Sequence, residues 1–418
     1  MKIKKRKRIL VFSSKIRPKR RKSGAKRLFS RRGLRKRQLV PSLPASPVLQ
    51  LHGMNLIGFP RAEMGLGESC RQIARGLQSA QVPFGLIHVH EGNPGRMEDT
   101  SWAHKEIMHP QYGTNLFVFN PDMMPYAVKQ LGPEVFQGRY NIGYWHWELP
   151  EFPAQFYSGF EVLQEIWVPS NFVLDSVSRC SPVPVVRIPT PVFVDTSVPF
   201  TRSFFSLPDH TFLFLTMYDM RSQQARKNPM GAVAAFQKAY SASDKSAGLV
   251  VKVNGIDHAP QEREKLKQQI EGWPNIYLIE KTLSRAEVNG LLQVCDSVVS
   301  LHRSEGFGLP LAEGMFLGKP VIGTDWSSTR DFMDQMNSCP VHYNRVQVGQ
   351  DIGPYEAHQM WANPDIEHAA YYMRRLLQDD GWRKQIAAKG QETIRINYSP
   401  EACGRIAVNR LKRIGVIA

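Results

Sequence analysis

Two glutamates around a glycine-bearing turn are the residues whose types and spacing most directly suggest chemistry in this sequence. Glu305 and Glu313 have seven residues between them, within LHRSEGFGLPLAEGMFLGKPVIGTD (residues 301–325). Such a pair could act as a catalytic acid and base, hold the hydroxyl groups of a ligand, or be two surface charges. The spacing of two acids discriminates poorly among these alternatives, so the elements around them must decide.

The stretch predicts a strand, a turn and a helix. SVVSLH is apolar enough for a buried strand, RSEGFG forms the turn after it, and LPLAEGMFLG has the pattern of a helix. Pro310 suits the first helical turn, and Gly318 suits the C-terminal cap. Glu305 then precedes the helix while Glu313 lies inside it, so we do not expect the two acids to face each other as a hydrolase pair.

The predicted turn has the features of an anion site. It would lie at the carboxyl end of a parallel strand, where open α/β sheets bind ligands. The N–H groups of residues 306–309 would point out of a helix N-terminus, which favours phosphate. Gly306 and Gly308 would let the backbone approach a diphosphate closely. We therefore expect each carboxylate to accept hydrogen bonds from hydroxyl groups, one from a sugar and one from a ribose.

The rest of the chain alternates short apolar runs with amphipathic segments. Buried strands are predicted for MNLIGF, NLFVFN, FLFLTMY and GLVVKVNG. Apolar residues at helical spacing occur in MGAVAAFQKAY and RAEVNGLLQVC. This alternation predicts parallel sheets covered by helices on both faces. Two such series within 418 residues predict two doubly wound α/β domains.

The basic excess of the chain belongs to one end. The net charge is +17, but residues 1–40 alone hold 19 Lys or Arg and no acid, so the other 378 residues carry −2. We expect a disordered tail that adheres to an anionic membrane surface; a solubilising extension or a misassigned start codon is the plain alternative. A nearly neutral body argues against nucleic acid as a partner.

Cysteine usage and hydropathy indicate the compartment. Five cysteines are dispersed without the spacing of a metal site or a disulfide framework, which is typical of a reducing environment. No apolar run approaches a membrane span, and ILVF in the tail is shorter than the apolar region of a secretory signal. These features predict a cytoplasmic protein, held peripherally on the inner face of the cytoplasmic membrane if the tail adheres there.

Several motifs resemble one known family. SEGFGLPLAEG, followed by GKPVIGTD, closely resembles the E-x7-E signature of retaining glycosyltransferases of family four, the group 1 enzymes. A subgroup of these enzymes, found in bacterial envelope polysaccharide synthesis, has segments that are similar to YNIGYWHWELPEFP, EIWVPSNFVLDSV, RKNP and MWANPDIEHAAYYMRRL. The resemblance covers roughly residues 53–415 and implies the GT-B fold, in which two Rossmann-like doubly wound domains face each other across a cleft.

The composition of the chain and the resemblance together divide it into parts. The expected divisions are a basic disordered tail (1–50), an acceptor-side domain (51–205), a nucleotide-sugar-binding domain (206–385) and a helical segment that packs back toward the first domain (386–418).

The resemblance implies roles for the residues around the opening motif. Glu305 would contact the donor sugar, and Glu313 would bind the ribose of the nucleotide. The backbone of Gly306, Phe307 and Gly308 would lie against the sugar and phosphate, and Leu309 would add a backbone contact to the diphosphate. His302 ends the strand before Glu305, where it could reach the sugar or pack beneath the loop.

Further residues complete the predicted site. Arg226 and Lys227 would neutralise the donor diphosphate, as charge-assisted contacts do, although Arg221 has a spacing from Lys227 that many relatives use. Gly65 and Gly67 follow a strand and precede a helix, where the loop of relatives approaches the donor phosphates. His146 lies near the position of a catalytic histidine, but an aromatic residue commonly occupies that place in this subgroup, so a histidine lining the cleft is the alternative.

The implied reaction is transfer of a hexose or deoxyhexose, mannose- or rhamnose-like, to a glycan or lipid-linked glycan acceptor. A nucleotide-diphosphate sugar is the co-substrate and no cofactor is expected. No D-x-D pattern ends a strand and no His/Cys cluster has ligand spacing, so no essential metal is expected. A non-catalytic nucleotide-sugar-binding scaffold is the alternative. The first strand–helix unit lacks G-x-G-x-x-G, which argues against a dinucleotide-dependent oxidoreductase.

Overall fold

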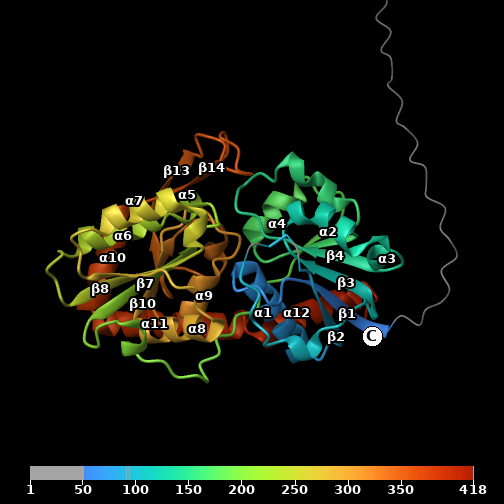
Figure 1. Cartoon of the computed structure of the whole chain (residues 1–418), viewed down its shortest axis with the longest axis horizontal. Coiled ribbons are helices and arrows are strands. Elements are labelled where there is room, and N and C mark those ends of the chain that lie inside the picture. Colours follow the sequence, from blue (N-terminus) through green and yellow to red (C-terminus); the bar gives the residue numbers. More distant parts are fainter. Residues whose placement is uncertain (1–50, 91, 94, 418) are drawn as a thin grey trace, which may run out of the picture. The chain divides into compact units, whose positions relative to one another are not determined.

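The chain folds around two β-sheets, each with helices on both faces (Figure 1). A computed structural model describes residues 51–90, 92–93 and 95–417, and all of these belong to one compact unit. The predicted basic tail, residues 1–50, lies outside the described residues. Among the helices that are described, none is long and apolar enough to cross a membrane.

The first sheet has six parallel strands in the order β2-β1-β3-β4-β5-β6. The strands are β1 (Leu51–Gly58), β2 (Phe84–His88), β3 (Tyr112–Val118), β4 (Tyr140–Tyr144), β5 (Glu165–Val168) and β6 (Val185–Arg187). Its helices are α1 (Gly65–Ser79), α2 (Met124–Leu131), α3 (Pro133–Phe136) and α4 (Asn171–Ser178), with 3-10 turns at Ala103–Lys105, Pro121–Met123 and Ala154–Phe160.

The second sheet also has six parallel strands, in the order β12-β11-β10-β7-β8-β9. The strands are β7 (Phe212–Asp219), β8 (Ala247–Asn254), β9 (Ile276–Ile279), β10 (Ser297–Ser300), β11 (Val321–Thr324) and β12 (Cys339–Val341). The helices that follow the linking segment are α5 (Gln224–Lys227), α6 (Pro229–Ala239), α7 (Pro260–Ile270), α8 (Arg285–Val294), α9 (Leu309–Phe316), α10 (Ile366–Gln378), α11 (Asp380–Asn397) and α12 (Pro400–Arg413), with 3-10 turns at Ser203–Phe205, Ile256–His258 and Ser327–Asp331.

The predicted fold class is confirmed. The apolar runs form the strands because both faces of each sheet are covered: Leu249, Val250 and Val251 are consecutive in β8, and all three are fully buried. A small antiparallel hairpin, β13 (Tyr343–Gln347) and β14 (Met360–Pro364), was not predicted. We use first half for the β1–β6 sheet with its helices, and second half for the β7–β12 sheet with its helices and the hairpin.

The predicted strand–turn–helix unit is also confirmed. β10 is followed by the turn and by α9, with Pro310 in the first helical turn. Gly308 precedes the helix with a φ of 92°, and Gly318 follows it with a φ of 71°, conformations that favour glycine. A Cβ on Gly308 would lie 2.7 Å from Cγ2 of Thr329, so space as well as backbone conformation selects glycine there.

The last two helices lie on different halves of the molecule. α11 packs against α9 in the second half, whereas α12 lies beside α1 of the first half (Figure 1). A Cβ on Gly404 of α12 would lie 2.5 Å from the carbonyl oxygen of Gly76, so the two helices approach closely. Arg410 of α12 binds the buried carboxylate of Glu165 through its Nε at 2.9 Å and through a second nitrogen. The chain thus returns to the first half at its C-terminal end.

Candidate functional site

A cavity of about 560 Å³ opens where the carboxyl ends of strands from both sheets meet. Its walls include the segments that follow β1, β3 and β4 in the first half and β7, β8, β9 and β10 in the second half, together with the loop between β13 and β14. This is the edge at which parallel sheets bind ligands. All of the residues predicted for the site line the cavity except His302 and Gly67.

The turn before α9 is held from both halves. The N–H group of Glu305 donates to Oγ of Ser327 at 2.9 Å. The hydroxyl group of Ser170, at the end of β5, donates to the carbonyl oxygen of Gly306 at 2.9 Å. A Cβ on Gly306 would lie 3.2 Å from the carbonyl oxygen of Trp147, so the backbones of the halves approach each other here. The turn is therefore fixed in place before any ligand arrives.

Two cations hold the carboxylate of Glu305. Nζ of Lys227 lies 2.6 Å from Oε1, and a guanidinium nitrogen of Arg226 lies 3.3 Å from Oε2. Burial alone would raise the pKa of Glu305, but Lys227 and Arg226 more than reverse this and lower it to about 2. At neutral pH the group is therefore a carboxylate, which accepts hydrogen bonds and has no proton to donate.

Arg226 joins Glu305 to residues that were not predicted for the site. Its guanidinium lies 3.6 Å from a carboxylate oxygen of Glu148, which follows β4 in the first half, and donates to the carbonyl oxygen of Ser304 at 2.9 Å. Tyr355, in the loop between β13 and β14, donates its hydroxyl hydrogen to Glu148 at 2.9 Å, and its ring lies 6.0 Å from the Arg226 guanidinium. Arg226 is buried, and Glu148, Tyr355 and Glu305 keep its pKa raised although burial would lower it.

A second charged group lies at the ends of β7 and β8. Arg221 binds the carboxylate of Asp219 through two nitrogens, at 2.9 Å and 2.6 Å. Burial would raise the pKa of Asp219, but Arg221 holds it below the ordinary value. Lys252 is also buried in the wall, and burial lowers its pKa to about 8. Arg221 thus lines the cavity as part of an ion pair with Asp219. Arg226 and Lys227 instead contact Glu305, the carboxylate predicted to bind the sugar.

The two predicted histidines have different surroundings. His146 lines the cavity after β4, and burial lowers its pKa to about 4, against the opposing effect of Glu148 and Glu305. His302 is fully buried, within 3.2 Å of Oγ of Ser300 and 3.4 Å of the carbonyl oxygen of Trp326, and burial also lowers its pKa to about 4. Both imidazoles are therefore neutral at pH 7, and His302 packs beneath the turn, which was the alternative to contact with the sugar.

The two predicted glycines after β1 also differ. Gly65 opens α1 and lines the cavity, and a Cβ there would meet no atom within 4 Å. Gly67 lies outside the cavity lining, and a Cβ there would lie 2.0 Å from the carbonyl oxygen of Ala62. Packing of α1 on the preceding loop is therefore sufficient reason for glycine at the second position.

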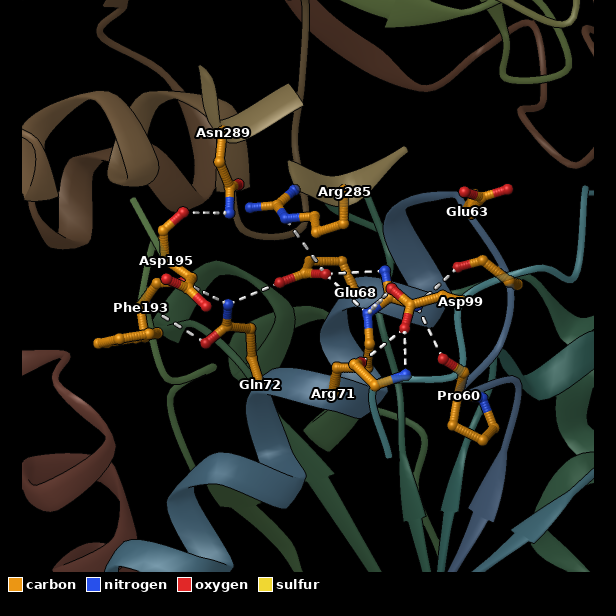
Figure 2. Close-up of polar contacts among 12 residues, drawn as sticks. Pro60, Glu63, Glu68, Arg71, Gln72, Asp99, Phe193, Asp195, Arg285 and Asn289 are labelled. Carbon is orange, nitrogen blue, oxygen red and sulfur yellow. Dashed lines mark hydrogen bonds and ion pairs between the residues drawn. The ribbon is translucent and has the colours of Figure 1, made fainter. Parts of the chain in front are cut away.

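The predicted ribose-binding residue Glu313 lies in a polar cluster that the sequence did not reveal. Arg285 of α8 forms an ion pair with Oε1 of Glu313, and its Nε lies 3.4 Å from Glu68 of α1. Figure 2 shows Glu68 between Arg71, Gln72 and Arg285. The cluster therefore joins side chains of α1 in the first half to side chains of α8 and α9 in the second half, and the large sequence separation between these helices leaves no motif spacing that could have indicated it.

The described residues contain no group of three or more His, Cys, Asp or Glu side chains placed to hold a metal ion. Positive charge at the cavity comes from six lining residues: Arg71, Arg221, Arg226, Lys227, Lys252 and Arg285. The absence of an essential metal stays a prediction. Chemically, the arrangement offers ionised carboxylates for hydroxyl groups, cations for phosphates and a helix start for an anion, all on one cavity.

Comparison with known protein families gives one match. Residues 217–349, which include both cations on Glu305 and the turn before α9, match the model described as glycosyl transferases group 1. No curated protein sequence matches the chain.

Solved structures show where this fold occurs. The chain is similar to a sucrose-phosphate synthase from Thermosynechococcus elongatus (TM-score 0.62, 15% identity, 87% of this chain and 99% of that one). It is also similar to a glycosyltransferase from Rickettsia africae (TM-score 0.60, 16% identity, 87% and 98%). A third is Anabaena HepE in complex with UDP and glucose (TM-score 0.58, 11% identity, 87% and 100%). At these identities the likeness shows the fold, which is the GT-B fold of glycosyltransferases.

Proposed function

We propose that this chain is a retaining glycosyltransferase that uses a nucleotide-diphosphate sugar to extend a glycan or lipid-linked glycan in envelope polysaccharide synthesis. The sugar would be a hexose or deoxyhexose, mannose- or rhamnose-like. The observation that carries the proposal is the ionised Glu305, held by Arg226 and Lys227 beside the start of α9, within the segment that matches the group 1 glycosyltransferase model. The complex of HepE with UDP and glucose supports this class of donor.

The donor would lie along the second half of the cavity wall. Lys227 and Arg226 would neutralise the diphosphate, together with the backbone of residues 306–309 at the helix start. Glu305 would accept hydrogen bonds from sugar hydroxyl groups, and Glu313 from the ribose. Because Lys227 already contacts Glu305 at 2.6 Å, binding of the donor would place the sugar and the diphosphate on neighbouring groups of one ion pair.

The charges at the site favour transfer of the sugar over catalysis by a carboxylic acid and a carboxylate base. As the bond between sugar and phosphate breaks, negative charge grows on the leaving diphosphate, beside Arg226 and Lys227. Glu305 holds the sugar while its anomeric carbon becomes cation-like. We propose a same-face displacement in which a phosphate oxygen takes the acceptor proton, because the two oxygens of Glu305 are held by Lys227 and Arg226 and its low pKa makes it a weak base and a weak nucleophile. Closure of the halves would exclude water from the cavity.

The test is a thermal-shift screen of the full chain against UDP-glucose, UDP-N-acetylglucosamine, GDP-mannose and dTDP-rhamnose. A ligand that binds only the folded state at about 100 times its Kd stabilises it by about 2.7 kcal/mol, so the true donor raises Tm measurably. Turnover with that donor and a glycan acceptor, unchanged in EDTA, should give a product of the same anomeric configuration by NMR. Failure of every nucleotide sugar to raise Tm would refute the proposal, and binding without transfer would favour the non-catalytic scaffold.

We also propose that residues 1–40 bring the enzyme to an anionic membrane surface. This rests on the 19 Lys or Arg residues of that segment, each of which contributes about 1 kcal/mol near such a surface. The full chain should sediment with vesicles that contain phosphatidylglycerol, less so at high salt, whereas a chain without residues 1–46 should stay in the supernatant. Equal sedimentation of both chains would contradict the proposal.

A further inference from the structure

One guanidinium is shared by carboxylates from the two halves. Arg285 of α8 forms an ion pair with Glu313 of α9, and its Nε lies 3.4 Å from Oε2 of Glu68 in α1. The side chains of Glu68 and Glu313 are 6% and 2% exposed, and that of Arg285 is 21% exposed. The contact between halves therefore reaches the residue proposed to bind the ribose through a single intervening side chain, Arg285. Figure 2 shows the Glu68–Arg285 part of this contact.

The cluster carries more negative than positive charge. Arg71 lies 2.7 Å from Glu68 and 3.3 Å from Asp99, so two guanidiniums serve three carboxylates. Burial would raise the pKa of Glu68, but Arg285 and Arg71 reverse this and lower it. For Glu313, burial raises the pKa, Arg285 opposes the rise, and the charge of Glu68 adds to it. Of the two glutamates, Glu313 is therefore the one whose ionised form is less stabilised.

The other elements packed against α9 bring little charge to Glu313. β10 and β11 contain no charged residue. α11 contributes Gln391, whose amide donates to the carbonyl oxygen of Phe316 at 3.1 Å, and Arg395, whose guanidinium lies 5.2 Å from the Phe316 ring at the far end of the helix. The charge state of Glu313 is therefore governed by Arg285, Glu68 and Arg71.

We propose that Arg285 and Glu68 are positioning residues for the donor: Arg285 keeps Glu313 ionised and oriented toward the nucleotide's hydroxyl groups, and Glu68, from the opposite half, competes with Glu313 for Arg285. The inference rests on the proposed function, because it takes Glu313 as the donor-binding carboxylate. The first half would thereby influence the affinity of the second half for the nucleotide.

The two residues should act in opposite directions on one measurable quantity. A carboxylate accepts hydroxyl hydrogen bonds, and its affinity for them falls when it is protonated. Donor affinity should therefore be high above the pKa of Glu313 and fall as pH drops through it. Removing the charge of Glu68 should lower that pKa and preserve binding to lower pH, whereas removing the charge of Arg285 should raise it and weaken binding at neutral pH.

The experiment is a titration of UDP-glucose and GDP-mannose into the full chain by calorimetry, from about pH 5.5 to about pH 8.5. In these probes each phosphate has one ester link and one anhydride link, and therefore lacks the second ionisation near pH 6 of a phosphate monoester. Glu68→Gln should shift the midpoint of the Kd profile to lower pH, and Arg285→Met should shift it to higher pH with about tenfold weaker binding at pH 7. Arg285→Lys, which keeps the charge, should restore much of the parent profile.

The control is Lys281→Met, which removes an exposed cation just before α8 that pairs with Glu287 and should leave the profile unchanged. Because Glu68→Gln is isosteric, it keeps the test available if Arg285→Met does not fold. Midpoints that coincide in all variants, or that move in the same direction, would overturn this inference alone. Failure of both nucleotide sugars to bind the parent would overturn the proposed function and, with it, the role of Arg285 and Glu68.

Discussion

Replacing Lys227 by alanine is expected to lower the rate of sugar transfer by about 10²–10³-fold, the usual cost of removing one group that stabilises transition-state charge. The lysine is placed for this role because its Nζ lies 2.6 Å from Glu305, at the junction proposed between sugar and diphosphate. The loss should fall mainly on kcat, since charge on the leaving diphosphate is largest as the bond breaks. The measurement is initial-rate kinetics with the donor found in the thermal-shift screen.

Lys238→Ala provides the matched control. Lys238 lies in the same half, on α6, and forms an exposed ion pair with Glu367 at 2.7 Å, and neither residue lines the cavity. Its removal should leave kcat and KM unchanged, because exposed ion pairs contribute little. A Lys227→Ala enzyme that transfers sugar as fast as the parent would remove Lys227 from the proposed chemistry and leave the fold assignment intact.

Replacing Arg226 by methionine is expected to destabilise the protein as well as inactivate it. Arg226 is buried and neutralises carboxylates that belong to different halves, Glu305 at 3.3 Å and Glu148 at 3.6 Å. Removing one partner of a buried ion pair costs about 3–5 kcal/mol, because the remaining charge stays buried without compensation. Calorimetric scans should show a fall in Tm of several degrees, together with loss of transfer activity.

The destabilisation should depend on pH. Glu305 has a pKa of about 2 in the folded chain, below the ordinary value of about 4.3, so its stabilising contribution is present above about pH 4.3 and lost as pH falls toward 2. The Tm difference between parent and Arg226→Met should therefore shrink in acid. Arg330→Met, at an exposed pair with Asp325, is the control and should change Tm little at any pH. A pH-independent difference would contradict the assigned charge network.

The fold could be predicted because its signals are local. Each strand of the two sheets except β12 coincides with an apolar run, since burial on both faces leaves mostly apolar side chains in a strand. The helix after the turn was predicted from Pro310, which suits a first helical turn, and from Gly318, which allows the left-handed conformation of a C-terminal cap. The hairpin β13–β14 was missed because YNRVQ is polar and largely exposed, and such a strand has no apolar run to indicate it.

The residues of the candidate site were predicted only where they belong to short motifs of consecutive residues. Arg226, Lys227 and Glu305 belong to recognisable motifs, and the structure brings them together. The partners Glu148 and Tyr355 reach Arg226 from another half and from the hairpin, and the Arg285–Glu68 contact joins residues more than 200 positions apart. Pairing of charges across such separations depends on the packing of the sheets, which no spacing in the sequence encodes.

The return of α12 to the first half has a consequence for the order of events during synthesis. Ala407 and Leu411 of α12 are buried in one core with Ile73 and Leu77 of α1, so residues near the end of the chain complete a core that begins near residue 54. Domains generally fold as they leave the ribosome, N-terminal part first. The core of the first half is therefore completed only after α12 (Pro400–Arg413) has been made, and an apolar face of α1 stays uncovered until then. Nascent chains truncated before Pro400 should therefore be the ones that chaperones retain.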